Sequence, residues 1–401
     1  MRRNVDFTVL LAYAAFVLIG LSTGVSGVLL LSQMHDYGVD RAVIGITFFT
    51  GSGGFLLGST TVGVLMSRFG TRAAVVAGGV LFLVAGLYTA TRPSFVVFLA
   101  VQVVLGYGTG LLESVLNAHL AALPNATNRL NRLHAFFGVG ALLGPLLATW
   151  VTGFASWPIV WLVLGLAALP LVVGFRMAYP SVARAAEPVV ATGERGVLRR
   201  PAVLLGAALL AVYVGIEFSM GNWSFGYLVQ ERGQSEAISG YAVSGYWFGL
   251  TAGRFVLSPI VARLGLGTVG LMYTCLVGVA GSVGLTWLAP IAGLAVLGFF
   301  LGPIFPTTMA VTPQLVEPRM VPSAIGMLNA GSVVGGSLMP WLAGVVAQGV
   351  GVWTLLPFTL ALALLQLAVW WPMARGLDGV PPKNPNPPTP LHDPKQHASP
   401  L

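Results

Sequence analysis

Three charged residues, Glu113, Glu217 and Arg254, lie in long stretches of this sequence that are otherwise apolar. Such stretches are typical of membrane spans, and a charged side chain at the centre of a bilayer costs roughly 2.5–3.5 kcal/mol to insert. Burial disfavours the ionised form of a carboxyl group, and proton coupling requires a carboxyl that changes its charge near neutral pH. Glu113 and Glu217 are therefore candidate proton-coupling groups.

Asn117 follows Glu113 by four residues. This spacing places both side chains on the same face of a helix, one turn apart. A carboxyl and an amide arranged in this way can hold a proton and exchange hydrogen bonds with a sugar hydroxyl. The alternative is a purely structural Glu113 that is hydrogen-bonded to a neighbouring helix.

Asn222 and Trp223 follow Glu217, and glycines stand at positions 215 and 221. Glycine weakens a helix, and a broken helix in a membrane can expose backbone groups to a ligand. We expect a break in this span, with Glu217 and Asn222 contacting hydroxyl groups and Trp223 covering the apolar face of a sugar ring. The alternative is a hydrogen bond between helices that holds two bundles together.

Arg254 lies about two turns before the predicted end of its span. We interpret it as a gate or packing residue that meets helix-terminal carbonyls; a salt bridge to a site glutamate and a contact with an anionic substrate are the alternatives. His119 and His134 could relay protons, but hydrogen-bonded positions near helix ends are the simpler interpretation. No cluster of His, Cys, Asp and Glu has the spacing of metal ligands, so neither a metal nor another cofactor is expected.

The composition explains why these charges stand out. Only 8% of the 401 residues are charged and 56% are hydrophobic, and the mean hydropathy is +0.85. A soluble domain has about 25% charged residues, which argues against a soluble enzyme. Long continuous apolar runs favour a polytopic helical membrane protein over a barrel of short alternating strands.

Apolar runs separated by short polar breaks predict twelve membrane spans. Their approximate ranges are 8–31, 43–66, 73–91, 95–121, 134–153, 157–176, 202–229, 237–262, 268–288, 290–312, 323–347 and 352–374.

An even number of spans places both termini on one side of the membrane. Of the 20 Lys and Arg residues, all but Arg41, Arg92, Arg232 and Arg254 fall on the side of the termini. Basic residues are enriched in cytoplasmic loops, so we expect both termini to be cytoplasmic in a cell (inner or plasma) membrane. The net charge of +8 thus reports topology, and it gives no support for binding to nucleic acid.

The longest internal polar segment divides the spans six and six. We expect an N-terminal six-helix bundle over residues 1–176, a cytoplasmic linker over 177–200 and a C-terminal six-helix bundle over 201–374. The proline-rich end, 375–401, predicts a disordered tail.

The two halves align with one another at a constant offset of 195 residues. The matches include Gly54 with Gly249 and Gly58 with Gly253. Bundles with an even number of spans repeat in parallel around an axis along the membrane normal, and transporters built this way bind substrate between the repeats near the middle of the membrane.

The segment from Gly63 to Arg72, GVLMSRFGTR, resembles the loop motif after the second span of the major facilitator superfamily. The family's aspartate is replaced by Ser67. The resemblance covers the chain to about residue 374, and it implies two six-helix bundles that work by alternating access. By the same resemblance Arg68, Arg72 and, in the second copy, Arg263 are expected to serve a cytoplasmic gate, together with Arg254.

Four further strings resemble the fucose:proton-symporter-like sugar carriers of that superfamily. They are GYGTGLLESVLN from Gly106, LNRLHAFFGVGA from Leu130, the seventh-span residues Tyr213 to Trp223, and GPIFPT from Gly302. The resemblance implies a proton-coupled sugar importer that contains no enzyme centre. An acid expected in the first span is absent, since Asp6 and Asp36 only flank it.

We therefore expect a monomeric secondary carrier for a small molecule, a sugar in the first place, driven by protons. The predicted substrate cavity is lined by Ser22, Ser26, Glu113, Asn117, Glu217, Asn222, Trp223 and Thr307. One alternative is an efflux antiporter for drugs or metabolites, because Gly140-x-x-x-Gly144-Pro145 partly resembles a motif of such proteins. A more remote alternative is a membrane sensor that does not transport.

Overall fold

A computed structural model describes residues 2–180, 196 and 199–377. In this part of the chain the secondary structure is helical, as the apolar runs predict. The middle of the predicted linker and residues 378–401 of the predicted disordered tail lie outside the described residues, whereas residues 375–377 end the last helix.

The first half begins with α1, and its second element is a short helix, α2, that leads into the second span. The helices are α1 (Arg2–Tyr37), α2 (Arg41–Ile44), α3 (Ile46–Thr89), α4 (Phe95–Ala121), α5 (Ala126–Thr152) and α6 (Pro158–Ala178). Helix α3 contains two of the predicted spans. Gly70 separates them with a backbone at φ 82° and ψ 167°, a conformation that glycine adopts readily.

The second half contains one broken span. Its helices are α7 (Pro201–Gln230), α8 (Glu236–Arg263), α9 (Thr268–Leu288), α10 (Pro290–Leu301), α11 (Ile304–Leu315), α12 (Val321–Gly349) and α13 (Leu355–Leu377), with 3₁₀ turns η2 (Pro318–Met320) and η3 (Val352–Thr354). The tenth predicted span, 290–312, is thus divided at Gly302 and Pro303 into α10 and α11.

Ten helical ranges in the described residues are long and apolar enough to cross a membrane. One of them, 41–89, holds the two arms of α3 on either side of Gly70, and α8, at 28 residues, is long enough to cross although it is not among the ten. With these two helices counted, every one of the twelve predicted spans corresponds to a helix or to the α10–α11 pair.

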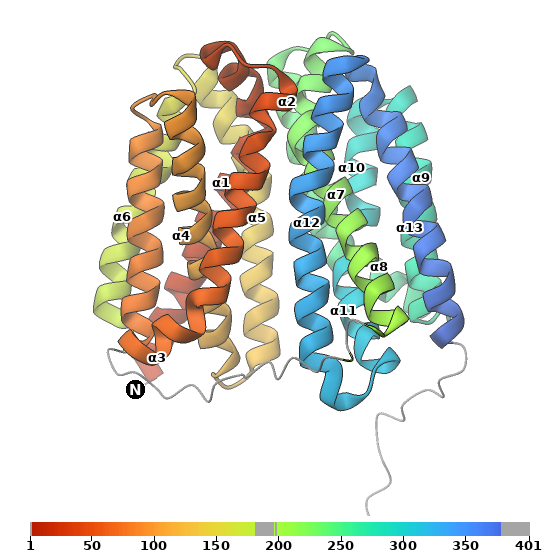
Figure 1. Ribbon diagram of the computed structural model, residues 1–401, viewed down its shortest axis with the longest axis horizontal. Helices are drawn as coiled ribbons and strands as arrows, with labels where there is room; N and C mark the ends of the chain where they lie inside the picture. The colour runs from red at the N-terminus through yellow and green to blue at the C-terminus, as the bar shows by residue number, and fades with distance from the viewer. Residues whose placement is uncertain (1, 181–195, 197–198, 378–401) are drawn as a thin grey trace, which may run out of the picture.

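The helices stand side by side in two bundles, α1–α6 and α7–α13 (Figure 1). Helix α1 begins and α13 ends on the same side, which we call the terminal face; the other side is the opposite face. The same pairs pack within each half: α1 with α5 and α3 with α4, then α7 with α12 and α8 with α10.

The internal repeat is visible in the backbone. Gly38 and Gly233 have φ angles of 63° and 62°, and Gly70 and Gly265 have 82° and 73°. Both pairs are separated by the predicted 195 residues, so the chain uses the same left-handed glycine geometry at matching points of the two halves.

Repeated glycines also bring helix backbones into contact. Gly54 packs against the carbonyl of Val103, and its partner in the repeat, Gly249, against the carbonyl of Ala295. Small residues allow such close approach, and van der Waals contact is a main source of association between helices in lipid. The glycine matches found by sliding the sequence on itself therefore mark helix contacts.

Candidate transport site

Glu217 lies in the middle of α7 and forms an ion pair with α8. Its side chain is buried, and the Nη2 atom of Arg254 lies 3.9 Å from its Oε1 atom. Tyr246, also on α8, donates its hydroxyl to the backbone carbonyl of Glu217 at 3.0 Å. The hydroxyl of Tyr213, one turn earlier on α7, is buried beside the pair. Two charges and two phenols from α7 and α8 thus form one polar cluster.

Arg254 also reaches the break in the tenth span. Its Nε atom donates to the carbonyl of Gly302 at 3.3 Å. That carbonyl lacks its usual helical donor because residue 306 is proline and has no N–H group. Arg254, predicted as a gate residue that meets helix-terminal carbonyls, therefore makes such a contact and also the salt bridge that was the alternative prediction.

Glu113 differs from Glu217 in having no partner for its carboxyl group. The residue is partly buried in α4, and among the described residues no hydrogen bond or ion pair reaches its carboxylate oxygens. The Nδ2 atom of Asn117 donates to the backbone carbonyl of Glu113 at 2.8 Å, which leaves the amide oxygen of Asn117 available. Glu113 and Asn117 are thus adjacent, as predicted, and the Glu113 carboxylate and the Asn117 amide oxygen are available to accept hydrogen bonds.

The expected break in the seventh span is wrong, because α7 is continuous from Pro201 to Gln230. Gly215 instead packs against Met339 of α12, and Gly221 against Trp247 of α8. Asn222 is buried and donates its amide to the carbonyl of Phe218 at 2.9 Å. The glycines provide room for neighbouring side chains, so the backbone groups of α7 stay in the helix.

Trp223 is buried at the contact between the two halves. Its Nε1 atom donates to the carbonyl of Pro340 at 2.8 Å, and its ring packs edge-on against Phe48, with centroids 6.1 Å apart. The void that it lines measures about 10 Å³, room for a single water at most. In this conformation Trp223 does not face a space that could hold a sugar ring.

The remaining predicted substrate residues lie in two helices. Ser22 and Ser26 on α1 donate their hydroxyls back to the carbonyls of Ile19 and Ser22, at 2.8 and 2.9 Å. Thr307 is buried on α11, just after the break. The hydroxyl oxygens of the two serines keep free lone pairs and can still accept from a ligand.

The sequence profile of the Major Facilitator Superfamily matches residues 12–292 and 208–400. The chain belongs to this superfamily. Bypass of stop codon protein 6 of Saccharomyces cerevisiae is 25% identical over 397 residues, covering 87% of this chain and 78% of the yeast protein. The glucose/mannose transporter GlcP of Bacillus subtilis is 23% identical over 357 residues, covering 84% and 87%.

The crystal structure of a D-xylose-proton symporter has the same fold. It superposes with a TM-score of 0.74 at 15% identity, covering 93% of this chain and 99% of the other. The predicted superfamily and its two-bundle fold are thereby confirmed, and the chain is a multi-pass membrane transporter.

The gate residues that the superfamily motif implies lie on the terminal face. Arg72 is partly buried and donates from Nε to the carbonyl of Tyr179 at 2.5 Å. Arg68 is exposed, with its guanidinium 5.4 Å from the ring centroid of Phe69. Arg263 is exposed at the end of α8. Arg72 holds the end of α6, and no bond described for Arg68 or Arg263 joins the two bundles.

The opposite face of this superfamily member is closed by a contact that the sequence did not reveal. Arg41, in the short helix α2, donates to the side-chain oxygens of Gln348 at 3.2 Å and Gln230 at 2.6 Å. Trp341 donates its indole N–H to the carbonyl of Ala42 at 3.2 Å. In the sequence Arg41 served only as a topology marker, since its two acceptors lie 189 and 307 residues away.

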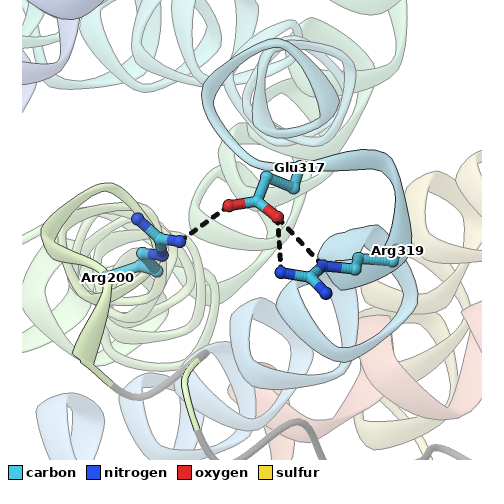
Figure 2. A network of polar contacts seen from close by, with 3 residues as sticks. All are labelled: Arg200, Glu317 and Arg319. Atoms are coloured by element: carbon cyan, nitrogen blue, oxygen red, sulfur yellow. Dashed lines mark hydrogen bonds and ion pairs between the residues drawn. The ribbon is translucent and has the colours of Figure 1, made fainter.

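A second polar network lies on the terminal face of the C-terminal bundle (Figure 2). Glu317 accepts from Arg200 at 2.8 Å with one oxygen and from Arg319 at 2.9 Å with the other. All three side chains are at least 46% exposed, and exposed pairs contribute little stability. The network ties the start of α7 to the loop after α11.

The histidines have structural surroundings. His119 Nε2 lies 3.3 Å from the hydroxyl of Thr8, and its ring lies against Tyr179. His134 packs edge-on against Phe16, with ring centroids 5.6 Å apart.

Proposed function

We propose that this transporter carries a sugar together with protons by alternating access, with Glu113 as the coupling carboxyl. The observation that carries the proposal is the free Glu113 carboxylate in α4, one turn from Asn117. A buried carboxyl that can bind and release a proton without losing a structural partner is suited to coupling. The names of two similar proteins, a glucose/mannose transporter and a D-xylose-proton symporter, support a sugar as the substrate.

We further propose that the terminal face is cytoplasmic and that the described conformation faces inward. The excess of Lys and Arg on that side supports the orientation. The bonds from Arg41 to Gln348 and Gln230 close the opposite face. Opening toward the outside would break these bonds, while the bundles approach one another on the terminal face.

Efflux is the weaker alternative, because the residues that suggested it have a packing role. Gly140 contacts the backbone of Val17, and Gly144 contacts the backbone of Leu21. Both glycines let α1 and α5 approach closely. This explains the Gly140-x-x-x-Gly144 spacing without an export function.

The first test is transport by purified protein in proteoliposomes, with labelled D-glucose, D-mannose and D-xylose as probes. For Glu113→Gln we expect gradient-driven uptake to fall by at least about a hundredfold, the lower end of the range for loss of a proton-transferring group. Counterflow exchange should continue, because exchange needs no net proton movement. Arg375→Gln, an exposed change at the end of α13, is the control.

Wild-type uptake by Glu113→Gln under a proton gradient would contradict the assignment of Glu113. Export of drugs, without counterflow of any sugar, would favour the efflux alternative. The absence of transport in either direction would favour the membrane sensor.

A further inference from the structure

Arg254 links the carboxylate of Glu217 in α7 to the break between α10 and α11. One guanidinium lies 3.9 Å from the Glu217 carboxylate and donates to the Gly302 carbonyl at 3.3 Å. The guanidinium has five N–H donors in a rigid planar arrangement. If the guanidinium moves away from Glu217, its position at the junction of α10 and α11 therefore changes as well.

The N-terminal half shows what this position does without the connection. Residue 59 corresponds to residue 254 at the 195-residue offset, and the hydroxyl of Ser59 lies 3.4 Å from the carbonyl of Gly110. Gly110 packs on the carbonyl of Phe55 just as Gly302 packs on that of Leu250, so in the fourth span the packing matches residues that are 192 positions apart, three fewer than the offset of the rest of the repeat. Both halves thus place a donor from the second span on the same carbonyl of the fourth, but serine is too short to reach further.

Helix α11 packs on α7, α9 and α12, and it meets the polar cluster at two points, one at its junction with α10 and one on α11 itself. Gly302 lies against the backbone of α8 at Leu250 and Arg254. The ring of Phe305, on α11, packs against that of Tyr213 with centroids 6.1 Å apart. The hydrogen-bond ladder is interrupted at Pro306, so side-chain contacts replace the bond that would keep α10 and α11 in line.

We propose that Arg254 is a positioning residue that transmits the charge state of Glu217 to α11. While the carboxylate is charged, Arg254 holds it and the Gly302 carbonyl together. When the carboxyl is protonated, the guanidinium loses its counter-charge and α11 changes its angle to α10. Thr307 lies on α11 and moves with it, and only the effect of that movement on a bound substrate rests on the proposed function.

Among the described residues, the titratable groups around Glu217 come from α7, α8 and α5. Tyr213 lies on the same helix as Glu217, Tyr246 and Arg254 come from α8, and His134 lies on α5, which packs against α8. Of these, Arg254 carries the charge that opposes the carboxylate. If Arg254 is replaced, the charge of Glu217 should therefore no longer affect the position of α11.

The experiment is a double-mutant cycle with Glu217→Gln, which imitates the neutral carboxyl, and Arg254→Ser, which installs the serine of the N-terminal half. Spin labels on Gln314→Cys (α11) and Leu204→Cys (α7), in a Cys275→Ser background, report the angle of α11 by electron paramagnetic resonance. Glu217→Gln should shift the distance distribution when Arg254 is present and leave it unchanged when Arg254→Ser is present.

An equal shift in both backgrounds, or no shift from Glu217→Gln alone, would overturn the proposal. If Arg254→Ser alone fails to fold because it leaves a buried carboxylate unpaired, the double variant replaces it. The double variant and Glu217→Gln should then share one distribution that differs from the parent, and a parent-like double variant would overturn the proposal. None of these measurements needs a substrate, so a wrong sugar assignment leaves them interpretable.

Transport supplies a second readout. With whichever probe sugar the parent transports, Arg254→Ser should lower kcat by at least about tenfold and change KM by less than about threefold, the pattern of a step after binding. Arg254→Lys, which keeps the charge, should lose less of the rate than Arg254→Ser. The control variant Ser59→Ala should have the kcat and KM of the parent. A main effect on KM would indicate direct substrate contact instead.

Discussion

The fourth spans of the two halves pack in the same way, but one is a continuous helix and the other is broken. In α4, Gly106 and Gly110 pack on the carbonyls of Gly51 and Phe55; in the second half, Gly298 and Gly302 pack on those of Tyr246 and Leu250. After these glycines α4 continues without a break to Ala121, whereas α10 stops at Leu301.

Two prolines account for the difference. Positions 111 and 114 of α4 are Leu and Ser, while the corresponding positions 303 and 306 are both Pro. The intact helix carries the unpaired Glu113, and the broken one is fixed by an arginine that is paired with Glu217. In the N-terminal half the carboxyl of Glu113 thus lies on a continuous helix, and in the C-terminal half the carboxyl of Glu217 is linked through Arg254 to a broken one.

The largest effect on stability is expected when a proline is introduced into the continuous helix α4. Ser114→Pro should remove the N–H that completes α4 after Gly110, at a cost of about 3 kcal/mol or more. Thermal unfolding in detergent should show a lower Tm and a loss of uptake.

The reverse change, Pro306→Ala, restores an N–H opposite the Gly302 carbonyl. It should raise the Tm and slow transport, because the restored bond ties α11 more rigidly to α10 even though Pro303 remains. A Pro306→Ala protein that transports at the parent rate would show that the break has no functional role.

A smaller effect separates the two glutamates. Glu217→Gln leaves Arg254 without its counter-charge, and loss of a charge-assisted interaction costs about 1–3 kcal/mol. Glu113→Gln removes no bond and should change the free energy of unfolding by less than about 0.5 kcal/mol. Urea or thermal unfolding of both variants is the measurement, and equal destabilisation would show that Glu113 has a partner as well.

The smallest effect is expected at the terminal-face arginines of the repeated loop. Arg68 and Arg263 are exposed, so Arg68→Ala and Arg263→Ala should change the transport rate by about two- to fivefold and substrate affinity by less, as expected for residues outside the binding site. A large loss of affinity in calorimetric titration with unchanged turnover would reject the gate assignment.

Much of the fold was predictable because hydrophobic length and glycine spacing are local properties of a sequence. The spans, including the two that share α3, and the 195-residue repeat follow from them. The break was predicted in the wrong span, since Gly215 and Gly221 were taken as flexible when they only admit Met339 and Trp247. The better signal was Gly302-Pro303 with Pro306, where two N–H groups are absent from one turn.

The site was predictable in composition and unpredictable in pairing. Glu113, Glu217 and Arg254 stood out by their insertion cost. Which glutamate meets the arginine depends on how α7, α8 and α10 cross, and no local pattern encodes that. The bonds of Arg41 were hidden for the same reason, because both acceptors are in the other half of the chain.

The closure at Arg41 has a consequence for the medium outside the membrane. Its guanidinium is held by the side-chain oxygens of Gln348 and Gln230, which carry no net charge. Dissolved ions screen the attraction between exposed opposite charges, with a screening length of about 10 Å at 0.1 M that falls to about 3 Å at 1 M, but they have little effect on a hydrogen bond to an amide. The balance between the closed and open forms of this face should therefore be nearly constant from dilute to concentrated salt, as it would not be if the two glutamines were glutamates.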